Sequence, residues 1–175
     1  MIGSSERFEI RRRWSGDLPG CVSALAEVHR VDGYPVAWPR DPARWLVESD
    51  QLACWVAVSA ATGEVVGHAG LCRGPGSSAA GVWAARGEGR VADAAGAVSR
   101  LYVAPPARGH GLGARLLDVV AAQARAWDLH PVLDVVTENT AAVELYHRRG
   151  WELLLTTDQI WPNGMTVAVH CFAAA

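Results

Sequence analysis

One short stretch combines glycines with basic side chains at the start of a predicted helix. It runs Arg108-Gly109-His110-Gly111-Leu112-Gly113, after the strand-like run 98–103 and a Pro-Pro pair, and it leads into a strongly amphipathic segment. Glycine lets the backbone approach a ligand closely, and the first N–H groups of a helix have no partner within that helix. Because the helix dipole adds positive potential there, the stretch predicts a site for a phosphate or pyrophosphate.

Two common nucleotide-binding motifs do not explain this stretch. The Walker A motif requires a lysine, and all 16 Lys and Arg positions of this chain are arginine. The segment 109–114 formally fits the dinucleotide fingerprint G-x-G-x-x-A. That fingerprint belongs in the tight first turn of a βαβ unit, whereas here two prolines intervene and the motif comes late in the chain.

A third motif fits better. Arg108-x-x-Gly111-x-Gly113 resembles the R/Q-x-x-G-x-G/A signature of the GCN5-related N-acetyltransferase (GNAT) superfamily. Further along, the run Asn139-x-x-Ala142-x-x-Leu145-Tyr146-x-x-x-Gly150-Trp151 resembles the second signature of that family, N-x-x-A-x-x-x-Y-x-x-x-G-F. The two signatures cover residues 97–152, and each falls on the kind of element where the family carries it.

The resemblance implies acetyl-CoA as cosubstrate and no metal. It places the pyrophosphate on the backbone and side chains of the glycine-rich stretch, namely Arg108, Gly109, His110, Gly111, Leu112, Gly113 and Ala114. It also implies a bulged strand, splayed from its parallel neighbour, in which the pantetheine arm pairs with the backbone of Leu101, Tyr102 and Val103. A backbone N–H there could also hold the tetrahedral oxyanion.

The second signature supplies two further candidates. Asn139 would bond the pantetheine arm, cap its helix, or do both. By the resemblance, Tyr146 protonates the leaving thiolate, and a phenol with a pKa of about 10 is suitably matched to a thiol with a pKa of about 8.5.

The general base is where the sequence departs from the family. Many members carry a glutamate on the strand before the glycine turn, and the corresponding positions here are Ala97, Val98 and Ser99. The remaining candidates are Glu88, Asp93, His68 (for which a structural role is favoured) and water acting alone. The acceptor side is equally open: Asp32 could attract an ammonium group or form a turn, and several aromatic residues could line the site. These are Tyr34, Trp38, Trp45, Trp83 and Trp161.

The elements that position these residues follow from hydrophobic periodicity. Strands are expected at 8–14, 52–59, 65–72, 97–103, 131–137, 151–160 and 165–172. Helices are expected from residue 18, with Asp17 as a possible cap, and at 42–47, 112–127 and 141–149. The segment 73–96 is expected to be a long mobile loop in which 79–86 could form a short helix.

This order, β-α-α-β-β-β-α-β-α-β-β, indicates a mixed α/β sheet and the single-domain acyl-CoA N-acyltransferase fold. The helix between 97–103 and 131–137 is a crossover that makes these two strands parallel. We expect one domain over residues 1–175.

Composition limits the alternatives. A net charge of -2 gives no reason to expect a nucleic-acid partner. The four cysteines are scattered without metal-ligand spacing, so buried free thiols are expected. The N-terminus lacks an apolar signal-peptide core, and no apolar run approaches the ~20 residues that cross a bilayer, so a soluble, cytoplasmic protein is expected.

We therefore expect an N-acetyltransferase that moves an acetyl group from acetyl-CoA to a primary amine by direct attack. The acceptor would be a small molecule or a peptide, with no membrane partner, and the C-terminal hairpin could support a homodimer. Because no base is assigned, the alternative is a non-catalytic acyl-CoA-binding or regulatory module of the same fold.

Overall fold

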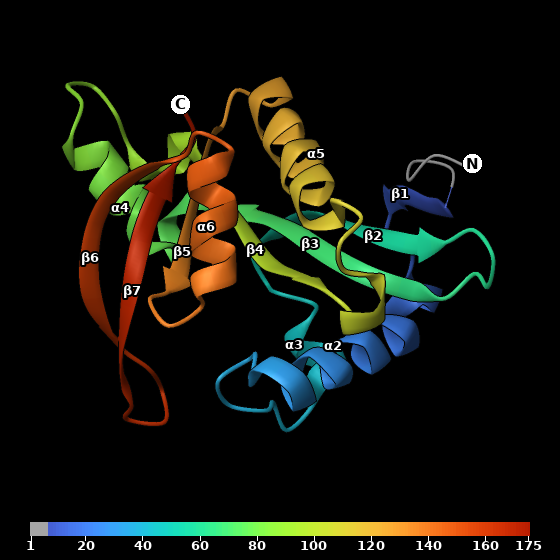
Figure 1. Ribbon diagram of the computed structural model, residues 1–175. Coiled ribbons are helices and arrows are strands. Elements are labelled where there is room, and N and C mark those ends of the chain that lie inside the picture. The colour runs from blue at the N-terminus through green and yellow to red at the C-terminus, as the bar shows by residue number, and fades with distance from the viewer. Residues whose placement is uncertain (1–6) are drawn as a thin grey trace. The chain divides into compact units, whose positions relative to one another are not determined.

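The structure is a computed structural model that describes residues 7–175 (Figure 1). Residues 1–6, which belong to the N-terminal stretch expected to lack a signal sequence, lie outside the described residues. The chain divides into two compact units, one made of Met1–Gly70 and Arg100–Val120 and the other of Leu71–Ser99 and Ala121–Ala175.

The described residues form a mixed sheet and five α-helices. The strands are β1 (Phe8–Arg12), β2 (Gln51–Ser59), β3 (Val65–Arg73), β4 (Ala95–Val103), β5 (His130–Val136), β6 (Glu152–Ile160) and β7 (Thr166–Ala173). The helices are α2 (Leu18–Asp32), α3 (Pro42–Trp45), α4 (Ser78–Ala85), α5 (Leu112–Ala126) and α6 (Thr140–Arg148). The seven strands follow the order β1-β2-β3-β4-β5-β7-β6, so the mixed α/β class is confirmed.

The strand pairings agree with the predicted topology. β4 and β5 are parallel, with register pairs from Ala95 with His130 to Ala97 with Val132, as the crossover through α5 requires. β7 pairs antiparallel with both β5 and β6, and a register shift interrupts β6 between Leu153 and Leu155. The order differs from the prediction by one added helix, α4.

In the first unit, α2 covers a core of apolar side chains. Pro19 lies in the first turn of α2, where its missing N–H costs no hydrogen bond, and Gly33 ends the helix in a left-handed conformation with φ of 70°. The buried members of this core are Cys21, Ala24, Leu25, Val28, Leu46, Val56, Val58, Tyr102 and Ala104. Burial of a leucine-sized side chain contributes about 1.5–3 kcal/mol, so this cluster is a main source of the unit's stability.

Asp17 does not cap α2, contrary to expectation. Its carboxylate instead accepts two hydrogen bonds of 2.8 Å from Arg11 and one of 2.7 Å from the backbone N–H of Trp14. The Arg11 guanidinium holds the pKa of the Asp17 carboxyl below its usual range. Asp41 does cap its helix, since its side chain accepts a hydrogen bond of 3.0 Å from Arg44 N–H at the start of α3.

The segment 73–96 in the second unit contains regular elements, and α4 confirms the short helix suggested for 79–86. Short 3-10 turns at Gly74–Gly76 and Ala92–Ala94 flank α4, whose Ala79, Ala80 and Trp83 are buried. Gly74 is needed by close packing, since a Cβ there would lie 2.2 Å from the carbonyl oxygen of Ala92.

The second unit ends in the predicted hairpin, which Figure 1 shows as the long pair β6 and β7. Its turn contains Gly164 with φ of 81°. The N–H of Gly164 bonds the carbonyl of Trp161 over 2.8 Å, and the N–H of Trp161 bonds the carbonyl of Met165 over 2.9 Å. The left-handed position explains the glycine of Pro162-Asn163-Gly164.

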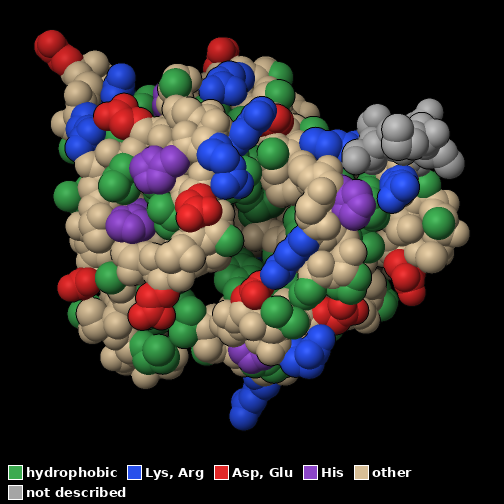
Figure 2. All heavy atoms as spheres, in the orientation of Figure 1, with side chains coloured by type: hydrophobic (Ala, Val, Ile, Leu, Met, Phe, Trp, Pro, Cys, Tyr) green, Lys and Arg blue, Asp and Glu red, His purple; other side chains and the backbone are tan. Residues whose placement is uncertain are grey.

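The cysteine thiols and the surface charges are as the composition predicts. All four cysteines are free and buried, as expected, and burial raises the pKa of the Cys21 thiol to about 12. Acidic and basic side chains are interspersed on the face shown in Figure 2. None of the helices within residues 7–175 has the length and apolar character needed to cross a bilayer.

Candidate functional site

Arg100, within strand β4, is left-handed, with φ of 48°. The conformation is unfavourable for a residue with a side chain, because its Cβ approaches the following carbonyl oxygen. Two residues further on, Tyr102 is buried. Its hydroxyl donates a hydrogen bond of 2.9 Å to the carbonyl oxygen of Cys21. Leu101 and Val103 are only partly buried. A left-handed residue within a strand redirects the backbone groups that follow it.

The glycine-rich stretch forms a turn that leads directly into α5. Gly109 and Gly111 have φ of 81° and 71°, and a Cβ built at either position meets nothing within 4 Å. The backbone conformation, and not lack of space, therefore requires glycine.

The first helical bond of α5 joins Arg115 N–H to the carbonyl of Gly111 over 3.0 Å. The N–H groups of Leu112, Gly113 and Ala114 precede that bond, so they have no acceptor within the helix. The Leu112 side chain is 2% exposed and anchors this end of α5 in the core. The turn thus presents helix-end N–H groups beside glycines, which is suited to an anion.

The two side chains of this turn that could contact a phosphate both have protein partners. Arg108 forms an ion pair with Asp32, at the C-terminus of α2. The Nε atom of Arg108 also donates a hydrogen bond of 3.1 Å to the carbonyl oxygen of Val103. His110 Nδ1 lies 3.1 Å from the carbonyl oxygen of Ala107. Asp32 thus holds Arg108 at the turn, a role different from the turn-forming or ammonium-binding role expected for it.

Asn139 and Tyr146 are positioned by α6 in the second unit. The Oδ1 atom of Asn139 accepts a hydrogen bond of 3.4 Å from Ala142 N–H, so this residue caps the helix. Tyr146 is 5% exposed, and its ring packs against Trp151 and Phe172, with centroids 6.2 Å and 5.6 Å away. The phenol ring is therefore held rigidly in its own unit.

The structure removes one candidate for the general base. His68 is fully buried, its Nδ1 lies 2.8 Å from the carbonyl oxygen of Arg100, and its Nε2 lies 2.9 Å from Arg13 Nη1. Burial lowers the pKa of His68 to about 4. Both nitrogens are already used, so His68 is not available to take a proton from an amine. Glu88 and Asp93 are exposed.

Strand β4 itself offers no carboxylate. Ala95, Ala97 and Val98 are buried apolar residues, and the Ser99 hydroxyl lies 3.3 Å from Cys72 Sγ.

The aromatic residues proposed for the acceptor site have different surroundings. In the first unit, Tyr34 packs edge-on against Trp45 with centroids 6.3 Å apart, while Trp38 is 40% exposed beside His29. In the second unit, Trp161 Nε1 donates a hydrogen bond of 3.2 Å to Oε1 of Gln159.

Trp83 is buried in the second unit. The His130 ring stacks on it at 4.7 Å, and the Arg90 guanidinium lies 4.9 Å from its centroid. Trp83 therefore has a packing role.

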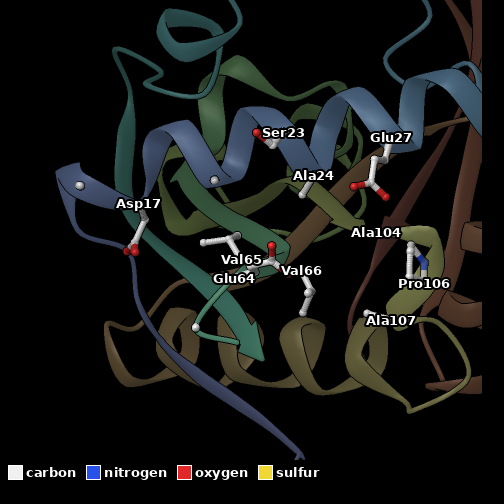
Figure 3. A pocket seen from close by; sticks show the side chains of 13 residues that line it. Asp17, Ser23, Ala24, Glu27, Glu64, Val65, Val66, Ala104, Pro106 and Ala107 are labelled. Carbon is white, nitrogen blue, oxygen red and sulfur yellow. The ribbon is translucent and has the colours of Figure 1, made fainter. Parts of the chain in front are cut away.

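A cavity of about 360 Å³ lies in the first unit, between α2, the β2–β3 turn and the residues that follow β4 (Figure 3). Asp17, Glu27 and Glu64 line it, together with small residues such as Ala104 and Ala107. Among the described residues that line it, none is basic. Its charge is therefore unfavourable for the phosphates of acetyl-CoA.

Sequence reasoning missed two structural groups. One is the chain of contacts from Arg13 through His68 to the Arg100 carbonyl, which links three separate segments. The other is Asp134, which caps α4 from strand β5. The sequence does contain a signal for the role of Asp134. It is the lone carboxylate in the apolar run 131–136, and a carboxylate in such a run needs buried hydrogen-bond partners.

Comparison with known proteins gives a family match. The model of the Acetyltransferase (GNAT) family matches residues 20–151. No match was found among curated proteins.

Several solved structures share the fold. NAA60 from Arabidopsis thaliana in complex with acetyl-CoA has a TM-score of 0.69 and 19% identity, over 95% of this chain and 97% of that one. Ribosomal-protein-alanine N-acetyltransferase from Brucella melitensis has a TM-score of 0.67 and 24% identity, over 94% and 98%. A GCN5-related N-acetyltransferase from Kribbella flavida has a TM-score of 0.66 and 22% identity, over 96% and 97%. At these identities the likeness establishes the fold.

Proposed function

Because the chain belongs to the acetyltransferase (GNAT) family, we propose that it transfers an acetyl group from acetyl-CoA to a primary amine by direct attack. The amine lone pair attacks the thioester carbonyl carbon, the C–S bond breaks, and the thiolate of CoA leaves and takes up a proton. No acyl-enzyme forms, since the amine itself is the nucleophile.

The observation that carries this proposal is the turn from Arg108 to Ala114. Left-handed Gly109 and Gly111 would allow a ligand to approach the backbone closely, and the N–H groups of Leu112, Gly113 and Ala114 have no acceptor within α5. These groups would bind the pyrophosphate of acetyl-CoA, together with His110 at the turn.

Arg108 would contribute charge to the pyrophosphate in exchange for its ion pair with Asp32. That pair is about 40% exposed on both side chains, so separating it costs little.

The pantetheine arm would bond the backbone of Leu101, Tyr102 and Val103, which follow the left-handed Arg100 in strand β4. A backbone N–H of the same segment would hold the oxyanion of the tetrahedral intermediate. Such a donor is effective because it is already oriented before charge develops.

Tyr146 would protonate the departing thiolate. Its ring is fixed by Trp151 and Phe172, so the hydroxyl is held in one place during the reaction. Asn139 would donate from its amide group to the pantetheine arm, since the helix cap uses only its Oδ1 atom. The proton of the attacking amine would pass to water, or to the exposed carboxylate of Glu88 or Asp93, because His68 is already fully hydrogen-bonded.

A second function is favoured by one observation. Positions 97–99 carry no carboxylate, and His68 cannot serve in its place, so the chain could bind acyl-CoA without turnover. In that case the protein would be an acyl-CoA-binding or regulatory module with the same fold.

Two measurements separate these functions. Isothermal titration with acetyl-CoA tests the donor site, and a thiol-release assay over a panel of amines tests transfer. The panel includes amino acids, polyamines, aminoglycosides and a peptide with N-terminal alanine, because one similar structure is named as a ribosomal-protein-alanine N-acetyltransferase. Amine-dependent thiol release supports the enzyme, binding without release supports the module, and no binding overturns both.

A further inference from the structure

The left-handed conformation of Arg100 needs a specific support. Its φ of 48° lies in a region that residues other than glycine rarely adopt, and it falls within strand β4. Such a conformation persists only when the surrounding structure fixes it. The contacts of its carbonyl group and of its side chain show where this support comes from.

The carbonyl group of Arg100 is held by His68 from strand β3. The Nδ1 atom of His68 lies 2.8 Å from this oxygen, and His68 has no exposed surface. The same imidazole stacks on the Tyr102 ring, with centroids 5.4 Å apart and planes 17° from parallel. One side chain therefore contacts the residues on both sides of Leu101.

Arg13 determines which nitrogen of His68 carries the proton. Arg13 Nη1 lies 2.9 Å from Nε2, and a guanidinium can only donate, so Nε2 must accept. A carbonyl oxygen can only accept, so Nδ1 must carry the hydrogen that reaches Arg100. Arg13 is itself held by the carbonyl of Leu46 at 2.9 Å and the side chain of Gln51 at 3.1 Å.

The side chain of Arg100 is held independently. Its guanidinium lies 3.8 Å from the centroid of the Trp45 ring and 3.3 Å from the carboxylate of Glu48. These contacts fix the guanidinium but do not orient the carbonyl group. Among the contacts of Arg100, the one from His68 is therefore the contact that orients its carbonyl group.

We propose that His68, oriented by Arg13, is a positioning residue that holds the left-handed turn at Arg100 and so aligns the backbone of Leu101–Val103 with the acyl-CoA. This inference rests on the proposed function, since only then does that backbone contact a substrate.

Two conservative variants separate the two nitrogens of the ring. The amide of His68→Asn can place an N–H near the position of Nδ1 and keep the bond to the Arg100 carbonyl. The longer His68→Gln places its polar group near Nε2, so it keeps the contact with Arg13 and loses the bond to Arg100. His29→Gln is the matched control, because His29 Nδ1 also bonds a carbonyl, that of Pro35 at 2.9 Å, away from β4.

The test is isothermal titration with acetyl-CoA together with amide hydrogen exchange of the segment 100–103. We expect His68→Gln to weaken binding about tenfold, which corresponds to about 1.4 kcal/mol, and to speed exchange in this segment. His68→Asn and His29→Gln should stay within about threefold of the wild type, or less than about 0.7 kcal/mol. Equal losses in the Asn and Gln variants, or no loss in either, would overturn the proposal.

A measurement on the wild type covers the case in which a variant does not fold. Nitrogen-15 NMR of the imidazole should show His68 neutral with the proton on Nδ1, and a proton on Nε2 would overturn the proposal. If the wild type does not bind acetyl-CoA, the proposed function fails. Hydrogen exchange in the variants then still decides whether His68 holds the turn.

Discussion

Asp134, in the middle of strand β5, accepts a hydrogen bond of 2.8 Å from the backbone N–H of Ala79, 55 residues earlier in the chain. The same carboxylate accepts from Ser78 N–H and from Ser77 Oγ, each at 2.9 Å. It therefore satisfies the first N–H groups of α4, which otherwise lack acceptors. A helix that the composition of its own segment barely predicts is thus fixed by a strand distant in sequence.

The first prediction concerns this cap. Asp134→Ala should lower the free energy of unfolding by about 2–3 kcal/mol, because it removes a helix cap and leaves half-buried donors unpaired. Urea denaturation followed by circular dichroism measures the loss. Asp158→Ala, an exposed residue of β6, is the matched control and should change stability by less than about 0.5 kcal/mol. A loss at Asp134 no larger than at Asp158 would show that α4 does not depend on the cap.

The arrangement of strands was predictable because each strand repeats a simple pattern. Alternating or continuous apolar residues mark β1 to β7, and the strand-helix-strand spacing around α5 requires a parallel pair. Helix α4 could only be suggested from the sequence, because its segment consists mainly of Ala, Gly and Ser, and such residues do not form a clear apolar face on a helix. Its stability comes from the cap by Asp134 and from the packing of its own Trp83 against segments such as that of His130, so the partners of both groups are distant in sequence.

The candidate site was predictable to the extent that its residues are local in sequence. The turn from Arg108 to Gly113 and the cap at Asn139 are each contained in one short motif, and their backbone geometry follows from glycine and asparagine. The support of Arg100 was not predictable, because His68 is 32 residues away from it and Arg13 is 55 residues from His68. Only the sheet brings these polar groups together.

The second prediction concerns pH. Burial, with Arg13 and Arg100 nearby, lowers the pKa of His68 from 6.5 to about 4 in the folded protein. Between these values the unfolded chain binds the proton and the folded chain does not, so the free energy of unfolding should fall as the pH drops from 6.5 toward 4. The contribution lost is up to about 3 kcal/mol.

Chemical denaturation at several pH values tests this dependence. The dependence should be weaker in His68→Asn, because an asparagine side chain does not titrate in this range. Equal pH dependence in the wild type and in His68→Asn would contradict the assignment to His68.

The third prediction distinguishes conformational strain from ligand contact at the glycine turn. Gly111→Ala and Gly63→Ala each place a Cβ on a left-handed residue, with φ of 71° and 72°, and neither Cβ meets an atom within 4 Å. Both should lower the free energy of unfolding by about 1–2 kcal/mol.

If the pyrophosphate binds at this turn as proposed, only Gly111→Ala should weaken acetyl-CoA binding, by on the order of tenfold or more, because its Cβ would hinder the close approach of the ligand to the backbone. Thermal denaturation and isothermal titration of the two variants measure both effects. Equal acetyl-CoA affinities in the two variants would remove the pyrophosphate from this turn.

The fourth prediction concerns the protonation of the leaving thiolate. Tyr146→Phe keeps the ring between Trp151 and Phe172 and removes only the hydroxyl, so the fold and the acetyl-CoA affinity should be nearly unchanged. If Tyr146 is the general acid, kcat should fall by on the order of 100-fold while KM for acetyl-CoA changes little. The matched control is Trp151→Phe, which alters the packing against Tyr146 and keeps the hydroxyl, and which should reduce stability more than kcat. Equal decreases in kcat for the two variants would assign the effect to packing and would leave the thiolate to be protonated by water.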